Sequence, residues 1–279
     1  MTAPTRHRAA PREVRLAASA MGTRFELVLL GDDRRALQAA GEAALARIEE
    51  AHQALSRFDS GSLIAHLRRC APTPVAIDRE TLAFFETVAA VARESDRAFN
   101  PYYDNPAGEA EWPVIDRQHG TVAFPSAHCD PDFGGCAKGF AIDWAVTVLR
   151  AAGIRQAFLQ GGASSAYGLG APPGKAGWRV ALGDRTGDPM VSLADRGLAC
   201  SATMSTRDGR RVAHVVDPRI HGIVAADRRV VVVGPSAGLA DAWATAALVT
   251  GARPDAMDGE WDFWIRKGEG PWRPLTTTA

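Results

Sequence analysis

The sequence predicts an α+β fold, a single compact domain in which mixed sheets and flanking helices form two sub-layers. Segments with helical spacing and short β-rich segments are interspersed along the chain, without the strict alternation of a doubly wound parallel sheet. The chain has 279 residues, enough to bury a large core, and it contains no internal repeat or low-complexity tract. One domain is therefore the organisation that we expect.

The first half of the domain is predicted from local spacing. Residues 22–30 alternate and then become apolar, which indicates a strand. Residues 34–55 are rich in alanine, and their apolar positions recur at helical spacing, so one long amphipathic helix is expected. Ser62 is placed to cap a short helix that continues through Arg69. A further helix is predicted over residues 80–95.

The second half begins with a loop-rich region. Residues 100–131 contain five prolines and little periodicity, and we expect them to face a ligand or a partner. The helix that follows ends before Gly153, and Ser236 caps a helix that ends before Gly251. The β-branched run 228–233 is typical of a strand buried on both faces. Other strand-like segments are 120–124, 156–160, 178–182, 197–201 and 211–216.

Composition argues against several classes of partner. Lys and Arg together number 32, as do Asp and Glu, so no field of one sign favours nucleic acid or an anionic membrane. Residues 1–13 contain no apolar stretch, so we expect neither a signal peptide, a lipobox nor a membrane anchor. The expectation is a disordered segment over 1–13 and a domain over 14–279, in a cytoplasmic protein without membrane insertion.

The four cysteines favour reduced thiols over a disulfide framework. Cys70, Cys129, Cys136 and Cys200 lie far apart and form no C-x-x-C spacing. His128 precedes Cys129, and Cys136 is near, so a zinc site is an open alternative that lacks an evident fourth ligand.

The segment from Asp132 to Asp143, with the sequence DFGGCAKGFAID, combines several features of a phosphate-binding corner. Its glycines allow the backbone to approach a ligand, Lys138 adds a positive charge, and the apolar run begins a helix whose first N–H groups would point at an anion. A simple turn is the alternative, because a glycine pair with a lysine is weak evidence alone.

Asp241 and Thr245 are four residues apart on a predicted helix, so their oxygens project from one face. They form half of a site for a hard cation such as Mg²⁺, which prefers oxygen ligands and leaves positions for phosphates. A structural role is equally open, because a helical threonine often bonds its own i−4 carbonyl.

His214 and Asp217 precede Pro218 at the end of a predicted strand, and a bend would be needed to bring their side chains together. His214 could accept a proton or bind a phosphoryl oxygen, or it could be a half-buried histidine bonded to a loop. Gly161 and Gly162 follow a strand, where they either approach a flat ring or form a simple turn.

In order along the chain, these segments resemble the FAD:protein FMN transferases, the ApbE-type flavin transferases. The resemblance is most specific in the Asp132–Asp143 segment and in ADAWAT at 240–245. The other similar segments are MGT at 21–23, LSRF at 55–58 with Ser62, FNP at 99–101, GG at 161–162, ACSA at 199–202 and HVVDP at 214–218.

The chain also departs from the family pattern. Phe58 stands where the family has a tyrosine that stacks on the flavin nucleotide, so the ring is kept and the hydroxyl is lost. Residues 200–202 read CSA in place of Thr-Ser-Gly, and Ala163 replaces a polar residue. The region 100–131 is shorter than its family counterpart, which removes part of the wall expected to enclose FAD.

The resemblance implies Mg²⁺-dependent transfer of FMN from FAD to a Ser or Thr hydroxyl of an acceptor protein, with release of AMP. Its alternatives are an FAD pyrophosphatase that yields FMN and AMP, and an inactive FAD-binding protein. The implied metal ligands are Asp241, Thr245 and the Ala137 carbonyl. Lys138 and His214 are the implied catalytic residues. The implied FAD contacts, with Asp143 as a hydrogen-bond acceptor for the nucleotide, are Met21, Phe58, Asp143, Gly161, Gly162 and Ser201.

Overall fold

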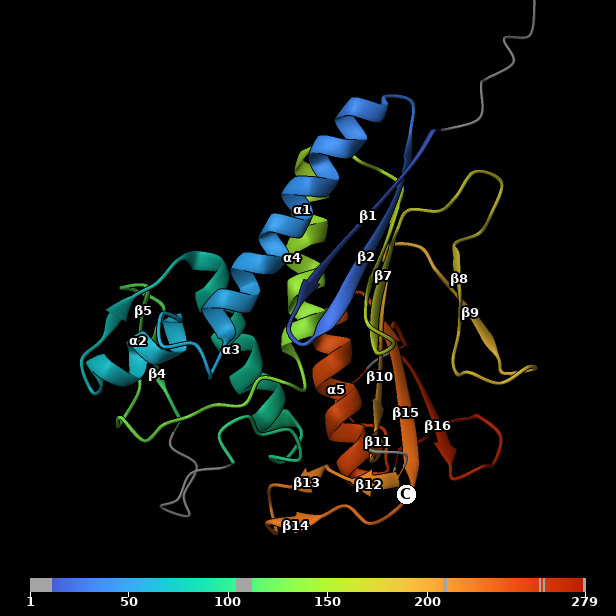
Figure 1. The fold of residues 1–279 in the computed structure, drawn as a ribbon. Helices are drawn as coiled ribbons and strands as arrows, with labels where there is room; N and C mark the ends of the chain where they lie inside the picture. Colours follow the sequence, from blue (N-terminus) through green and yellow to red (C-terminus); the bar gives the residue numbers. More distant parts are fainter. Residues whose placement is uncertain (1–11, 104–111, 208–209, 256, 258, 278–279) are drawn as a thin grey trace, which may run out of the picture.

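A computed structural model shows one large antiparallel sheet, with helices on one face and a small lobe beside it (Figure 1). It describes residues 12–103, 112–207, 210–255, 257 and 259–277. The predicted α+β class is confirmed. The eight strands, in spatial order, are β1 (Arg12–Ala20), β2 (Thr23–Gly31), β6 (Ala157–Gly161), β7 (Ser165–Leu169), β10 (Arg196–Ala202), β15 (Arg228–Gly234), β16 (Asp262–Lys267) and β17 (Arg273–Pro274).

Three helices, α1 (Arg34–Leu55), α4 (Ala137–Ala151) and α5 (Ala237–Thr250), cover one face of this sheet (Figure 1). The bounds of α1 match the prediction, and Asp33 caps the helix by accepting hydrogen bonds from two backbone N–H groups. Ser236 caps α5, and Gly251 ends it at φ +75, where a side chain would be strained. Both caps follow the sequence prediction for α5.

The opposite face of the sheet is covered by a hairpin of β8 (Trp178–Ala181) and β9 (Met190–Leu193) (Figure 1). A second apolar cluster, which includes Leu193, Val231, Val233 and Trp272, fills the space beneath it. Because α5 packs on the other face, β15 is buried from both sides, as its β-branched sequence predicts.

The lobe consists of α2 (Leu63–Cys70), α3 (Arg79–Glu94) and a small sheet of β3 (Val75–Ala76), β5 (Thr121–Ala123) and β4 (Val114–Asp116). Ser62 caps α2 as predicted. Edge-to-face aromatic contacts join α3 to the segment before α4, including Phe84 with Phe133 at 4.9 Å between ring centroids. The lobe is therefore packed against the helical layer.

Several strands were not predicted. β1, β7 and β16 are central or terminal strands of the main sheet, and the predicted segment 211–216 is split. Its parts belong to two hairpins, β11 (Met204–Arg207) with β12 (Arg210–Ala213), and β13 (Val216–Asp217) with β14 (Gly222–Ile223). β1 also begins at Arg12, inside the segment 1–13 that we expected to be disordered, whereas residues 1–11 lie outside the described residues.

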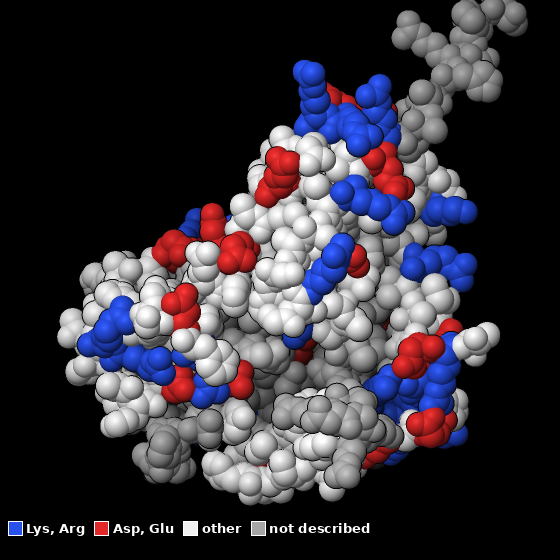
Figure 2. All heavy atoms as spheres, viewed as in Figure 1, with Lys and Arg blue, Asp and Glu red and all other residues white. Residues whose placement is uncertain are grey.

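The surface shows charges of both signs. On the face drawn in Figure 2, basic and acidic side chains are interspersed, in agreement with the formal net charge of zero. No helix in the described part of the chain has the length and apolar character to cross a bilayer.

Candidate active site

A cleft of about 420 Å³ lies where the lobe, the α4–α5 pair and the end of β10 meet. Its walls come from residues 98–103 after α3, the 132–138 turn before and at the start of α4, residues 200–202, residues 214–218 and the cleft-facing residues of α5. The predicted ligand-facing region therefore contributes Asn100, Pro101 and Tyr103, and the part at 104–111 lies outside the described residues.

Asp241 is the buried acid of this cleft, with only 3% of its surface exposed. Its Oδ2 atom accepts hydrogen bonds from Gly139 N at 3.2 Å and Ser165 Oγ at 3.3 Å. Lys138 Nζ lies 3.9 Å from the same oxygen. All these contacts with described residues involve Oδ2, so Oδ1 remains for a ligand in the cleft.

Burial raises the pKa of Asp241 above its ordinary value, and Lys138 and the bonds from Gly139 and Ser165 oppose the shift. A carboxylate in this position gains stability when a further cation approaches, because the cation replaces the lost hydration. The site is therefore suited electrostatically to bind a cation.

Thr245 adds a hydroxyl one helical turn from Asp241. Its Oγ1 lies 3.3 Å from the Gly135 carbonyl oxygen and 3.2 Å from the Asp241 carbonyl oxygen. Ser201 Oγ, at the end of β10, lies 3.4 Å from Thr245 Oγ1. Both roles expected of Thr245 are thus visible, since it bonds its i−4 carbonyl and also faces the cleft.

Lys138 is at the first turn of α4, where it borders the cleft. Its Nζ donates to the Gly134 carbonyl at 3.2 Å, and its side chain is partly buried. The backbone of Gly134 and Gly135, the Lys138 ammonium and the N-terminus of α4 therefore meet at one edge of the cleft. This is the arrangement that the sequence predicts for a phosphate-binding corner.

His214 also lines the cleft, from the segment between β12 and β13. Its backbone N donates to the carbonyl of Thr203, which is fully buried and anchored through its hydroxyl to Ala226 and Arg228. No described residue forms a hydrogen bond with the imidazole. Its ring is therefore accessible to a substrate hydroxyl.

Asp217 does not pair with His214. Arg219 binds the Asp217 carboxylate with both arms of its guanidinium, at 2.9 and 2.8 Å. These bonds, opposed by burial, hold the pKa of Asp217 below its ordinary value. The strand breaks between β12 and β13, at residues 214–215, but the Asp217 carboxylate is bound by Arg219 and forms no hydrogen bond with the imidazole.

Asp143, expected to bind the nucleotide, has other partners. It accepts hydrogen bonds from Ser236 Oγ at 2.6 Å, Ala237 N at 2.9 Å and Gly238 N at 2.8 Å. Its carboxylate thus caps α5, and the residue is not among those that line the cleft. No local pattern predicts this capping role, because Asp143 lies more than 90 residues from its partners.

The other expected FAD contacts, apart from Ser201, are not among the residues that line the cleft. Met21, at φ 50, and Gly22 form the β1–β2 turn. Gly162 follows β6, and its N–H donates a hydrogen bond to the backbone carbonyl of Arg24, beside that turn. Gly161 lies against Phe25, whose ring a Cβ atom would meet at 2.7 Å. Phe58 is on the loop between α1 and α2, and Ser201 alone of this group lines the cleft.

The donor set around Asp241 fits a hard cation. It consists of a carboxylate oxygen, the Thr245 hydroxyl and the carbonyl of Gly135, all oxygens. Ala137, the expected carbonyl ligand, is buried as the first residue of α4 and is not among the lining residues. The residues present therefore suit Mg²⁺, with the carbonyl ligand coming from the turn at 135–137.

The zinc alternative gains no support. No group of three or more His, Cys, Asp or Glu side chains suited to a metal occurs in the described part of the chain. Burial raises the pKa of the Cys136 thiol above its ordinary value. It also raises the pKa of Cys200, to about 11.

Sequence reasoning missed two groups that contact Asp241. Ser165 is almost fully buried, and its hydroxyl reaches Oδ2 from β7. The Gly139 N–H reaches the same oxygen from α4. Only the packing of α4 and β7 against α5 reveals these contacts, since Ser165 and Asp241 are 76 residues apart.

Comparison with known proteins gives consistent relatives. The ApbE family matches residues 21–257. The chain is 29% identical over 136 residues to the FAD:protein FMN transferase of Salmonella typhimurium, and 36% identical over 131 residues to that of Rhodobacter capsulatus. These matches cover 44% and 43% of this chain, but only 37% and 24% of the two relatives.

Solved structures share the fold. The ApbE protein from Thermotoga maritima aligns with a TM-score of 0.78 at 20% identity, over 95% of this chain and 97% of that protein. The flavinyl transferase ApbE from Pseudomonas stutzeri aligns with a TM-score of 0.74 at 21% identity, over 97% and 96%. At these identities the likeness shows the fold alone.

Proposed function

We propose, from the premise that this chain belongs to the ApbE family, that it transfers FMN from FAD to a Ser or Thr hydroxyl of an acceptor protein and releases AMP. The observation that carries this proposal is Asp241, a buried carboxylate with one oxygen left for a ligand, beside Lys138 and Thr245. His214, which lines the same cleft, supplies a base.

Mg²⁺ is the cation that we infer for this site. Asp241 and Thr245 would hold it together with a carbonyl of the 135–137 turn, because these donors are all oxygens. When bound, Mg²⁺ would neutralise charge on the pyrophosphate of FAD. Its presence is an inference from the donor chemistry.

Two side chains act on the reacting groups in this proposal. Lys138 binds a phosphate oxygen from the N-terminal turn of α4, which stabilises charge that develops there. His214 accepts the proton of the acceptor hydroxyl. The acceptor oxygen then bonds to the phosphorus of FMN, the bond from that phosphorus to the bridging oxygen breaks, and AMP leaves.

Ser201 borders the cleft, whereas Met21, Phe58, Gly161 and Gly162 are not among its lining residues. In this proposal these four residues contact the flavin end of FAD where it extends beyond the cleft. Phe58 retains the aromatic face that stacking needs, without a phenolic hydroxyl. Asp143 caps α5, the helix that carries Asp241 and Thr245, by accepting hydrogen bonds from its first N–H groups. In this proposal it does not bind the nucleotide.

The test is AMP release from FAD, measured by chromatography with and without Mg²⁺, for the wild-type protein and Asp241→Ala. We expect metal-dependent AMP from the wild type and a loss of at least about 100-fold in the variant. FMN that appears free, rather than on an added acceptor, would identify hydrolysis. FAD binding without AMP, even with acceptor present, would identify an inactive flavin-binding protein.

A further inference from the structure

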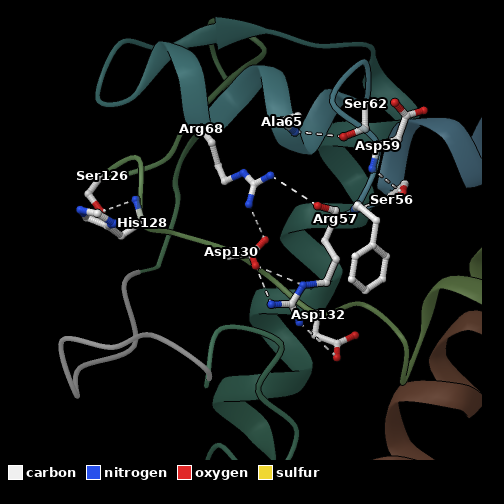
Figure 3. A network of polar contacts seen from close by, with 11 residues as sticks. Ser56, Arg57, Asp59, Ser62, Ala65, Arg68, Ser126, His128, Asp130 and Asp132 are labelled. Carbon is white, nitrogen blue, oxygen red and sulfur yellow. Dashed lines mark hydrogen bonds and ion pairs between the residues drawn. The ribbon is translucent and has the colours of Figure 1, made fainter.

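The loop at residues 56–62, between α1 and α2, has a backbone held by its own side chains. Ser56 Oγ accepts hydrogen bonds from the N–H groups of Phe58 and Asp59 (Figure 3). Asp59 Oδ1 accepts a further hydrogen bond from Gly61 N at 2.8 Å. Such bonds define one turn conformation. Within this ordered loop Phe58 is 91% exposed, so its ring is presented to solvent rather than to the core.

Asp130 holds this loop from a distant part of the chain. Arg57 donates to Asp130 Oδ2 through Nε at 3.2 Å and Nη2 at 2.5 Å. Arg68, on α2, donates to Asp130 Oδ1 at 2.8 Å and also binds the Arg57 carbonyl at 3.4 Å (Figure 3). All three side chains are partly buried, which strengthens the ion pairs relative to exposed ones.

The same arginine reaches the edge of the cleft. Arg57 Nη1 lies 3.5 Å from Asp132 Oδ2 (Figure 3). Asp132 Oδ1 in turn accepts a hydrogen bond from Gly134 N at 2.8 Å. Asp132 and Gly134 both line the cleft. The Phe58 loop is therefore joined through one guanidinium to the turn that borders the phosphate-binding corner.

We propose that Arg57, Asp130 and Arg68 are positioning residues for FAD. They hold the Phe58 loop at the rim of the cleft, so that the flavin meets a wall already in place. This inference rests on the proposed function. A preformed wall improves affinity because the loop is already ordered before FAD binds. Binding then loses no conformational entropy of this loop. The cluster acts on FAD binding and takes no part in the transfer of the phosphoryl group.

A matched ion pair lies in the same lobe. Arg117 binds Glu86 on α3 with two bonds, at 2.7 and 2.8 Å. Its guanidinium-bearing side chain is 81% exposed, and neither residue lines the cleft. Like Arg57, Arg117 donates to one carboxylate through Nε and Nη2, although it reaches both oxygens of Glu86 whereas Arg57 reaches only Oδ2 of Asp130. It has no connection to Asp132, so Arg117→Ala is the control for the loss of an arginine–carboxylate pair in this lobe.

The experiment measures FAD affinity from flavin fluorescence at equilibrium, KM for FAD and kcat from AMP release, and Tm. We expect Asp130→Ala and Arg57→Ala to raise Kd and KM for FAD about tenfold, while kcat changes less than about twofold. Asp130→Glu should recover most of the affinity, and Arg117→Ala should bind FAD as the wild type does. Arg57→Ala leaves the Arg68–Asp130 pair and is the milder change if Asp130→Ala fails to fold.

Three results would overturn the inference. Unchanged FAD affinity in folded Arg57→Ala would remove the positioning role. A fall in kcat and Tm with KM unchanged would show a purely structural cluster. A wild-type protein that neither binds FAD nor releases AMP would overturn the proposed function together with this inference. The first two results, by contrast, would overturn only the positioning role, because in them the wild type still binds FAD.

Discussion

Two carboxylates at the contact between α4 and α5 have opposite surroundings. Asp143, on α4, accepts three hydrogen bonds of 2.6 to 2.9 Å from the N-terminal turn of α5. Asp241, on α5, accepts two bonds of 3.2 and 3.3 Å, both on one oxygen. Burial raises the pKa of both groups. The direction of the pKa shift therefore does not distinguish the two groups. They differ in whether both carboxylate oxygens have hydrogen-bond partners.

This difference separates an acid whose oxygens are satisfied by a helix from one that has an oxygen left for a ligand. A carboxylate whose oxygens are satisfied by a helix N-terminus stabilises the fold. A buried carboxylate with one oxygen facing a cleft has lost hydration free energy that its protein contacts do not fully replace. A ligand that binds this oxygen can replace it. Both residues belong to segments that resemble family motifs, so the motif alone assigned them similar importance.

The largest effect on stability is expected at Asp143. Asp143→Ala leaves Ala237 N, Gly238 N and Ser236 without their acceptor, and should lower the free energy of unfolding by about 3 kcal/mol. Asp241→Ala should change it by about 1 kcal/mol or less, because a buried charge is removed along with long hydrogen bonds. Urea unfolding of both variants measures this. Equal losses would contradict the distinction between the two acids.

A smaller effect is expected where α4 and α5 approach most closely. A Cβ atom on Gly139 would lie 2.2 Å from the Ala237 carbonyl oxygen, so Gly139→Ala should force the helices apart and cost about 2 kcal/mol. It should also reduce activity, since Gly139 N holds Asp241. Gly259→Ala is the control, because nothing lies within 4 Å of its added Cβ. Similar unfolding curves for the two variants would refute the close packing.

The smallest effect concerns a third carboxylate, Asp217, whose pKa is lowered by its bonds to Arg219. A lowered pKa adds stability above the unfolded value of 3.8, and that stability is lost as pH falls through the folded value. Arg219→Gln should cost about 1 kcal/mol at neutral pH, a modest amount because Arg219 is partly exposed.

The measurement for Arg219→Gln is the free energy of unfolding of wild type and variant across the acid range. The gap between them should shrink as pH falls through the lowered pKa of Asp217. A gap that stays constant into acid would mean that the ionised carboxylate does not provide the stability.

Much of the fold could be predicted because its signals are local. Helix α1 and the caps at Ser62, Ser236 and Gly251 follow from spacing and from hydrogen bonds within a few residues. β16 was missed because its partner β15 lies before α5 in the sequence, whereas β1 forms a hairpin with the adjacent β2 but has only one β-branched residue, Val14. The 211–216 segment was predicted as one strand, whereas its halves join separate hairpins.

By itself the sequence determined the α+β class, the helix ends and the residue types that can bind a phosphate or a hard cation. It did so because spacing and side-chain chemistry act over short distances. Only the tertiary structure decided which aspartate faces the cleft and which caps a helix. Asp143 meets its partners across more than 90 residues and Arg57 meets Asp130 across 73, and such contacts exist only once the layers have packed.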